Sequence, residues 1–214
     1  MRDHNTGDIT KFVDHILAIE LDLPSWAEVQ QNIHLSLERS DNEFGDAIHL
    51  PITDDIHLVT VYTPPDESRI VWIGIKHLKK WNISQKDILA VARMNMAVLV
   101  GKYKVVVESK GSSYLAYFDS DSPFKASFIL SPKLKEQLPK ELGWPVLAVV
   151  PARDFVYFLK EGDNELINKV GSVVVKEFAQ SGYPITKELL KISDQGIEAI
   201  GAFDTVISGT ENQK

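Results

Sequence analysis

The chain has 214 residues, of which 44% are hydrophobic and 25% charged, so it is long and apolar enough to form a substantial core. Its formal net charge of -7 repels nucleic-acid backbones and anionic membrane surfaces. The absence of cysteine excludes disulfides, thiolate catalysis and cysteine-ligated metal centres. We therefore expect neither a nucleic-acid partner nor a membrane partner.

The first twelve residues, MRDHNTGDITKF, contain neither an apolar signal-peptide core nor a cleavage motif. No apolar run in the sequence approaches the ~20 residues that a membrane-spanning helix needs. From these two features we predict a cytoplasmic protein.

The first predicted element is a helix over residues 8–20, where apolar residues recur at helical spacing and Asp8 occupies the N-cap position. The alternation of apolar and polar residues at 33–38 then predicts a half-buried strand. The stretch 69–76 is apolar on both faces, which is typical of a central strand. Two further strands are predicted at about 46–50 and 56–63.

Two long amphipathic helices are predicted, at about 85–100 and at about 164–180. Ser84 precedes the first as its N-cap, Asp87 occupies the third helical position as in a capping box, and Gly101 follows the last residue. The other predicted elements are strands at 103–109, 113–119, 125–130, 145–150 and 154–159, and short helices at 131–138 and 186–192.

This order of elements predicts an α+β fold with mostly antiparallel strands, because strands joined by short connections pair antiparallel. We expect a single domain over residues 1–204 and a frayed polar tail at 205–214. A helix followed by several strands occurs twice, which leaves open two sub-lobes, at about 8–80 and 81–204, built as related halves. No residue-level repeat supports that second hypothesis.

Motifs for catalysis and for cofactor binding are absent from the sequence. It contains no phosphate-binding glycine loop, no dinucleotide fingerprint, no G-x-S-x-G elbow and no H-E-x-x-H. We therefore predict no cofactor, and the absence of motifs favours a protein that is not an enzyme. That inference is limited to local motifs, because catalytic groups can also come from distant positions.

The tripeptide Ile-His-Leu occurs three times, around His34, His49 and His57. On strands with buried apolar flanks the three imidazoles point away from the core, and three converging imidazoles can bind zinc. The spacings match no metal motif, so we favour histidines on the polar side of half-exposed strands. A metal site is the alternative.

Asn95 falls in the middle of the apolar stripe of the helix at 85–100. A buried amide must find hydrogen-bond partners or cost ~1–3 kcal/mol. We therefore expect Asn95 to bind the backbone of a neighbouring strand or loop. The alternative is an amide presented to a ligand.

The charged pair Arg153 and Asp154 stands between two apolar runs in VVPARDFVYFL. Pro151 suits the second position of a type I turn over residues 150–153, which would leave both charges largely exposed at a hairpin. The structural alternative is an extended chain with a bulge that turns one charge inward, where an ion pair needs full hydrogen bonding. The functional alternative is a ligand site.

Four segments of the chain resemble the uncharacterised bacterial YtpQ-like family, a domain of unknown function. They are WNISQKDILAVARMNM, FKASFILSP, VVPARDFVYF and YPITKELL, and the resemblance covers about residues 78–192. Departures from the family pattern include Ala152 in place of serine and Met96 in place of leucine. The resemblance implies no catalytic residue. It implies that Asn95, Arg153 and Asp154 belong to one recurring design.

These observations favour a non-enzymatic binding or protein-interaction module whose partner is a protein or a small molecule. The alternative is an enzyme acting on a small polar or anionic molecule, with Arg153 clamping the anion and Asp154 orienting it or accepting a proton. A pocket where these two residues and Asn95 converge would favour the enzyme. An exposed apolar patch with a polar rim would favour the interaction module.

Overall fold

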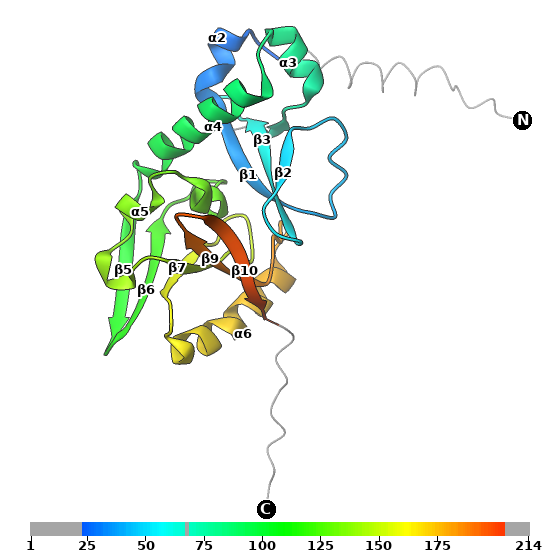
Figure 1. Ribbon diagram of the computed structural model, residues 1–214. Coiled ribbons are helices and arrows are strands. Elements are labelled where there is room, and N and C mark those ends of the chain that lie inside the picture. Colours follow the sequence, from blue (N-terminus) through cyan, green and yellow to red (C-terminus); the bar gives the residue numbers. More distant parts are fainter. Residues whose placement is uncertain (1–22, 67–68, 204–214) are drawn as a thin grey trace, which may run out of the picture.

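The computed structural model describes residues 23–66 and 69–203; the predicted helix at 8–20 and the predicted tail at 205–214 lie outside them. The described strands form two antiparallel sheets, which lie one above the other in the view of Figure 1. Helices pack against both sheets. The fold is α+β with antiparallel sheets, so the class that the sequence predicts is confirmed.

The first sheet has β3 at its centre. β1 pairs with one edge of β3, while β2 and β4 share its other edge, β2 against residues 57–59 and β4 against residues 61–62. On β1, Ser36 and Glu38 are buried as well as the apolar residues of the opposite face. This strand is therefore covered on both sides, more than its alternating sequence predicts. The strands are β1 (Ile33–Arg39), β2 (His49–Pro51), β3 (Ile56–Tyr62) and β4 (Val71–Trp72).

The second sheet has the strand order β10-β9-β7-β8-β6-β5, and its strand pairs are all antiparallel within the described residues. Its edge strands are therefore β10 and β5. The strands are β5 (Lys104–Lys110), β6 (Ser113–Asp119), β7 (Val146–Val149), β8 (Tyr157–Lys160), β9 (Glu188–Ser193) and β10 (Gly196–Ala202).

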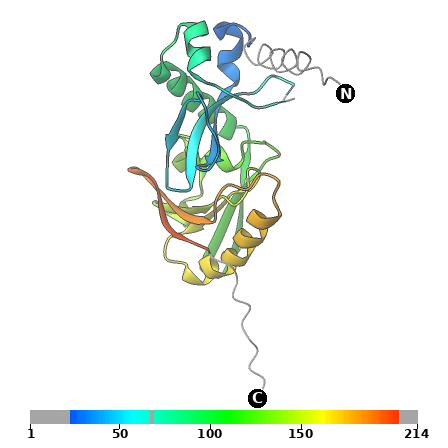
Figure 2. The same ribbon diagram turned by 90° about the vertical axis from the view of Figure 1, so that its right-hand side faces the viewer.

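The two longest described helices pack on different sheets. α4 packs against β1 of the first sheet, and α6 covers one face of the second (Figures 1 and 2). At the start of α4 the Asp87 N–H donates to Ser84 Oγ (3.1 Å), as the predicted capping box requires. None of the helices in residues 23–66 and 69–203 has the length and hydropathy of a membrane-crossing segment. The helices are α2 (Trp26–Val29), α3 (Ile75–Trp81), α4 (Gln85–Val100), α5 (Leu134–Gln137) and α6 (Asn164–Gln180), with 3₁₀ helices at Gln30–Asn32, Ala126–Leu130 and Lys140–Leu142.

The predicted central strand at 69–76 is wrong. Only Val71 and Trp72 form a strand, at the edge of β3, and α3 begins directly after Gly74. α3 buries Leu78 and Trp81, which are three residues apart and so lie on one face of a helix. The apolar run therefore combines the end of a short strand with the start of a helix, two elements that one periodicity cannot describe.

Two further predictions are wrong: one predicted strand is a helix, and one predicted helix is a strand. The predicted strand at 125–130 is a 3₁₀ helix, in which four consecutive residues from Ala126 to Ile129 are buried, so no two-residue alternation exists. The predicted short helix at 186–192 is strand β9, which alternates buried and half-exposed residues and pairs with both β7 and β10. Its Glu, Leu and Lys residues favour helix intrinsically, and the sheet pairing overrides that preference.

Side chains from both sheets meet in one main hydrophobic core, while a smaller cluster lies under α6. Polar ties also cross between the sheets. Thr53, in the loop before β3, donates its hydroxyl to the buried Glu188 of β9 (2.7 Å), and Leu37 of β1 donates its N–H to Ser127 Oγ (2.9 Å). The first contact joins the β2–β3 loop to the second sheet, and the second joins β1 to the 3₁₀ helix at Ala126–Leu130.

Candidate binding groove between the two sheets

The corner that carries Arg153 and Asp154 turns later in the chain than the sequence predicts. The Phe155 N–H donates to the Ala152 carbonyl (3.1 Å), so Arg153 and Asp154 are the central residues of the turn. Pro151 precedes this turn and does not occupy its second position. The Arg153 N–H in turn donates to the Tyr183 carbonyl (3.1 Å), which holds the corner against the strand region before β9.

The Arg153 side chain points inward and makes an ion pair with Glu38 of β1. One guanidinium nitrogen donates to both carboxylate oxygens, at 2.9 and 3.1 Å, and the Ser36 hydroxyl donates to the same carboxylate (2.8 Å). The side chain of Arg153 is 20% exposed and that of Glu38 only 5%. The Tyr183 ring covers the guanidinium, with its centroid 4.6 Å from Cζ. The two side chains form a largely buried ion pair, in which Arg153 Nε has no hydrogen-bond partner among the described residues.

Asp154 points to solvent, and no hydrogen bond or ion pair joins its side chain to another described residue. A cavity of about 530 Å³ lies beside this corner, lined by Arg153, Asp154, Glu177 and Tyr183 among others. The positive charge of Arg153 is already balanced by Glu38, and the two further carboxylates repel anions. The cavity is therefore poorly suited to an anionic ligand.

Asn95 lies at a different place from the Arg153 corner. Its side-chain amide donates to the Gln30 carbonyl (2.7 Å) and to the Ile33 carbonyl (2.8 Å). It thereby fastens α4 to the junction where the chain enters β1. The structure does not bring Asn95 together with Arg153 and Asp154, and the amide donor is occupied by backbone.

Two of the three histidines come together, and the third does not. His49 Nδ1 and His57 Nδ1 lie 2.9 Å apart, and the Phe44 ring stacks on both imidazoles. His34 instead stacks on Phe124, with its Nδ1 buried and without a hydrogen-bond partner among the described residues. In the described part of the chain, no three His, Cys, Asp or Glu side chains are grouped so that they could hold a metal ion.

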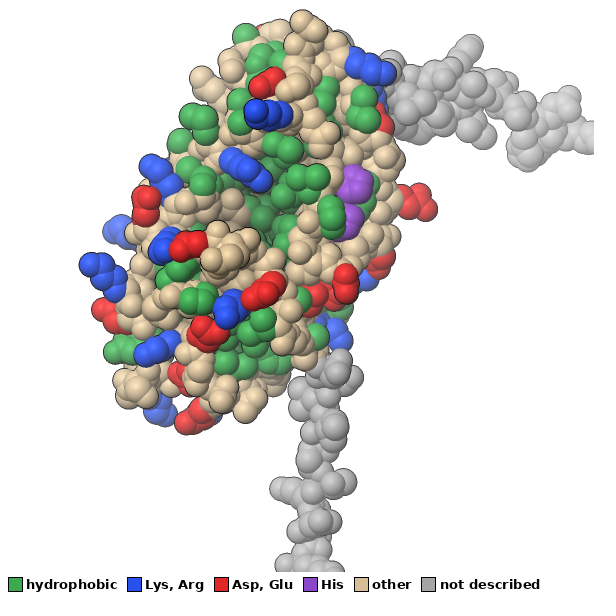
Figure 3. All heavy atoms as spheres, viewed as in Figure 1, with side chains coloured by type: hydrophobic (Ala, Val, Ile, Leu, Met, Phe, Trp, Pro, Cys, Tyr) green, Lys and Arg blue, Asp and Glu red, His purple; other side chains and the backbone are tan. Residues whose placement is uncertain are grey.

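A groove of about 650 Å³ opens where the two sheets meet, and we call it the seam groove. Figure 3 shows hydrophobic side chains gathered in a hollow in the middle of this face. Its floor is part of the main core, since Leu35, Leu58, Ile129 and Ile192 are all buried. Its further apolar lining comes from Ile52, Leu130, Leu134, Trp144 and Ile197.

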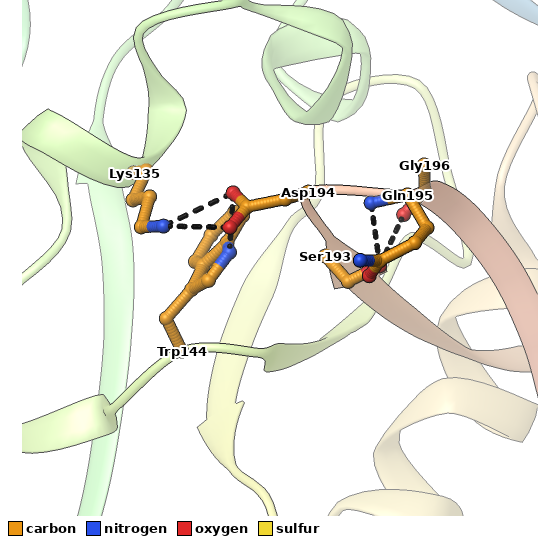
Figure 4. Close-up of polar contacts among 6 residues, drawn as sticks. All are labelled: Lys135, Trp144, Ser193, Asp194, Gln195 and Gly196. Carbon is orange, nitrogen blue, oxygen red and sulfur yellow. Dashed lines mark hydrogen bonds and ion pairs between the residues drawn. The ribbon is translucent and has the colours of Figure 1, made fainter.

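Polar side chains border the seam groove at the turn between β9 and β10. The Lys135 ammonium donates to both oxygens of Asp194 at 3.0 Å, and the Trp144 indole N–H donates to one of them, also at 3.0 Å (Figure 4). The hydrogen bond from Lys135 is the main cause that lowers the pKa of Asp194, so this carboxylate is charged at neutral pH. Arg93 of α4 also lines the groove and has no hydrogen bond or ion pair within the described residues.

The seam groove leaves no motif in the sequence, because its residues come from distant segments of the chain. One local signal was available. Ser193-Asp194-Gln195-Gly196 has the composition of a tight turn, and the Gln195 N–H does donate to Ser193 Oγ (3.2 Å). Recognising this turn would have replaced the predicted short helix at 186–192 with a hairpin. It would not have revealed which elements lie opposite.

A comparison with protein-family models, curated proteins and solved structures gives no match to this chain.

Proposed function

We propose that this protein is a non-enzymatic binding module that takes an apolar side chain of a partner into the seam groove. The observation that carries the proposal is an exposed apolar hollow whose rim is polar, at the seam of two sheets (Figure 3). Contiguous apolar surface of this kind marks interaction sites, because each square ångström removed from water contributes roughly 25 cal/mol.

The construction of the groove also favours binding. Leu35 and Leu58 sit on paired strands, and Ile192 sits on β9, so the floor is held by sheet hydrogen bonds and does not need to form when the partner arrives. Lys135, Asp194 and Trp144 hold one another in place at the rim. A preformed site loses less conformational entropy on binding.

The second candidate is an enzyme that acts on a small polar or anionic molecule at Arg153 and Asp154. The cavity beside these residues favours it. Two observations argue against it: Glu38 neutralises Arg153, and backbone carbonyls already occupy the Asn95 amide. Of the three expected site residues, Asp154 is then the one whose side chain makes no hydrogen bond or ion pair to a described residue. An exposed carboxylate without a partner group among the described residues is a poor candidate for acid–base chemistry.

We further propose a cytoplasmic location and a structural meaning for the family resemblance. If the YtpQ-like family shares one design, its recurring residues brace the fold, because Arg153 and Asn95 both bind groups of the first sheet or its entry. In the same scheme α4 and α6 are the two amphipathic helices, each supporting one sheet.

A displayed library of random peptides tests the proposal on the full chain. Wild type is expected to enrich peptides with a large apolar residue. Leu130→Asp places a charge at the half-buried groove wall and should abolish this enrichment, while Val107→Asp, on an exposed position of β5, should not. Ile52→Asp, at another half-buried lining position, serves if Leu130→Asp does not fold. The proposal would be ruled out if both groove variants still enriched these peptides. It would also be ruled out if wild type enriched no peptide.

A further inference from the structure

Within residues 23–66 and 69–203, one edge of β10 has no partner strand. There β10 pairs with β9 alone, and of its seven residues only Ile197 is half-buried while the others are exposed. Successive strand residues direct their backbone groups to alternate sides, so an edge strand presents unpaired N–H and C=O groups to solvent. Such an edge is a template for another strand unless side chains or bulges protect it.

The two edges of the second sheet differ in protection. β5 carries Lys104, Glu108 and Lys110, and charged residues are the usual means of blocking edge-to-edge pairing. β10 carries a single charge, Glu198. A bulge interrupts its pairing between Ala199 and Gly201, which protects the end of the strand but leaves Gly196–Ala199 regular.

The open part of β10 begins at the seam groove. Gly196 and Ile197 both line the groove, so a strand paired with Gly196–Ala199 leads directly into it. The charged residues that line the groove are Arg93, Lys135 and Asp194. Because Lys135 and Asp194 neutralise each other, the local charge is that of Arg93, positive in a chain with a formal net charge of -7.

We propose that the partner in the seam groove is an extended peptide segment that adds to β10 as a further strand. The segment carries an apolar side chain for the groove and an acidic side chain for Arg93. In this mode of recognition, main-chain hydrogen bonds supply affinity and alternate side chains supply specificity. The inference rests on the proposed function, because it names the class of partner for the same groove.

A second copy of this chain does not fit these observations as well. In a two-fold pairing of β10 with β10 of another copy, the strands run antiparallel, so the partner's strand start faces Ala202. The partner residues beside the groove are then Gly201 and Ala202, which have no large side chain to fill it, and Phe203, which packs against α6 of its own copy. A peptide from a different molecule satisfies the edge and the groove together.

The first test is a scan of backbone N-methylation along a peptide selected from the random library. Strand addition predicts that methylation at every second residue weakens binding about tenfold, since each blocked amide loses one hydrogen bond to β10. Methylation of the intervening residues should leave affinity unchanged. An effect without this period of two would overturn strand addition. If Leu130→Asp still abolished binding, the proposed function would survive that result.

The second test reverses the charge that the peptide meets. Arg93→Glu should weaken the acidic peptide about tenfold or more and should select basic residues from the library instead. Lys86→Glu, an exposed position on the same helix outside the groove, is the matched control and should change nothing. Unchanged selection by Arg93→Glu would overturn the acidic class of partner. If wild type formed a dimer in sedimentation experiments and the selected peptide dissociated it, the proposed peptide partner would be overturned in favour of a second copy of the chain.

Discussion

Arg153 and Glu38 form the ion pair that joins the corner after β7 to the first sheet. Both carboxylate oxygens of Glu38 accept hydrogen bonds from the guanidinium, and little of either side chain is exposed. Removal of one partner leaves the other as an uncompensated charge in a poorly solvated place. The ion pair therefore helps to hold the two sheets in their relative position.

Arg153→Ala should accordingly destabilise the protein by about 3–5 kcal/mol, because it leaves the Glu38 carboxylate buried without its cation. Asp154→Ala is the control from the same turn and should change the free energy of unfolding by less than about 0.5 kcal/mol. Urea denaturation of the three proteins measures both effects. Equal stability of Arg153→Ala and wild type would mean that the pair is solvated and contributes nothing.

His34 is a residue whose ionisation opposes folding. Burial is the main cause that lowers its pKa to about 4, and the positive charge of Lys102 lowers it further, while the backbone of Asn32 acts in the opposite direction. The unfolded chain takes up this proton near pH 6.5 and the folded chain only near pH 4. Between these values the unfolded state binds more protons, so stability falls as the pH falls from 6.5 to 4.

His34→Phe removes this proton uptake and keeps the ring stack on Phe124. The difference in unfolding free energy between the variant and wild type should therefore change on the order of 3 kcal/mol between pH 7 and pH 4, in favour of the variant at low pH. Chemical denaturation at several pH values measures it. Parallel curves for the two proteins would contradict a neutral, buried His34. Other titrating groups are present in both proteins and cancel in the difference.

At the scale of elements, the sequence predicted best where a segment carries its own signals. Ser84 and Asp87 specify the start of α4 locally, and the structure contains the predicted capping box. The prediction of a helix at 186–192 was wrong because these helix-favouring residues form β9. This strand pairs with β7, which lies about 40 residues earlier in the chain. β10 was missed because its glycines and alanines have weak strand preferences and only its pairing with β9 defines it.

α6 contains a glycine whose role depends on a residue outside the helix. A Cβ added to Gly171 would lie 2.6 Å from a ring carbon of Phe203, which follows β10. Gly171 thus lets the end of β10 pack against α6. The usual reason to replace a helical glycine by alanine, a gain of about 1 kcal/mol in helix propensity, does not apply at this position.

Gly171→Ala should therefore lower the melting temperature instead of raising it, because the added methyl group displaces the Phe203 ring. The double variant Gly171→Ala with Phe203→Ala should show no further loss beyond that of Phe203→Ala alone. Gly182→Ala has open space around the added Cβ and serves as the control. A higher melting temperature for Gly171→Ala, measured by circular dichroism, would show that Phe203 does not pack there.

At the scale of the whole molecule, the site is a product of how the sheets meet. Arg153 and Asn95 stood out in the sequence, yet both serve to fasten elements together. Residues of β1, β3, α4, α5 and the β9–β10 turn line the seam groove. No local sequence pattern indicates that these segments share a surface. Sequence patterns report the period of single elements, whereas a groove of this kind depends on long-range pairing and packing.

The most direct measurement of the central claim is a map of amide ¹H–¹⁵N chemical-shift changes when wild-type protein is titrated with a library-selected peptide. Binding in the seam groove predicts the largest changes at residues 129–135 and 192–199, with the Arg93 side-chain Nε–H signal also shifted. Changes concentrated at Arg153, Asp154 and Tyr183 would contradict it and would assign ligand binding to the cavity beside the corner instead.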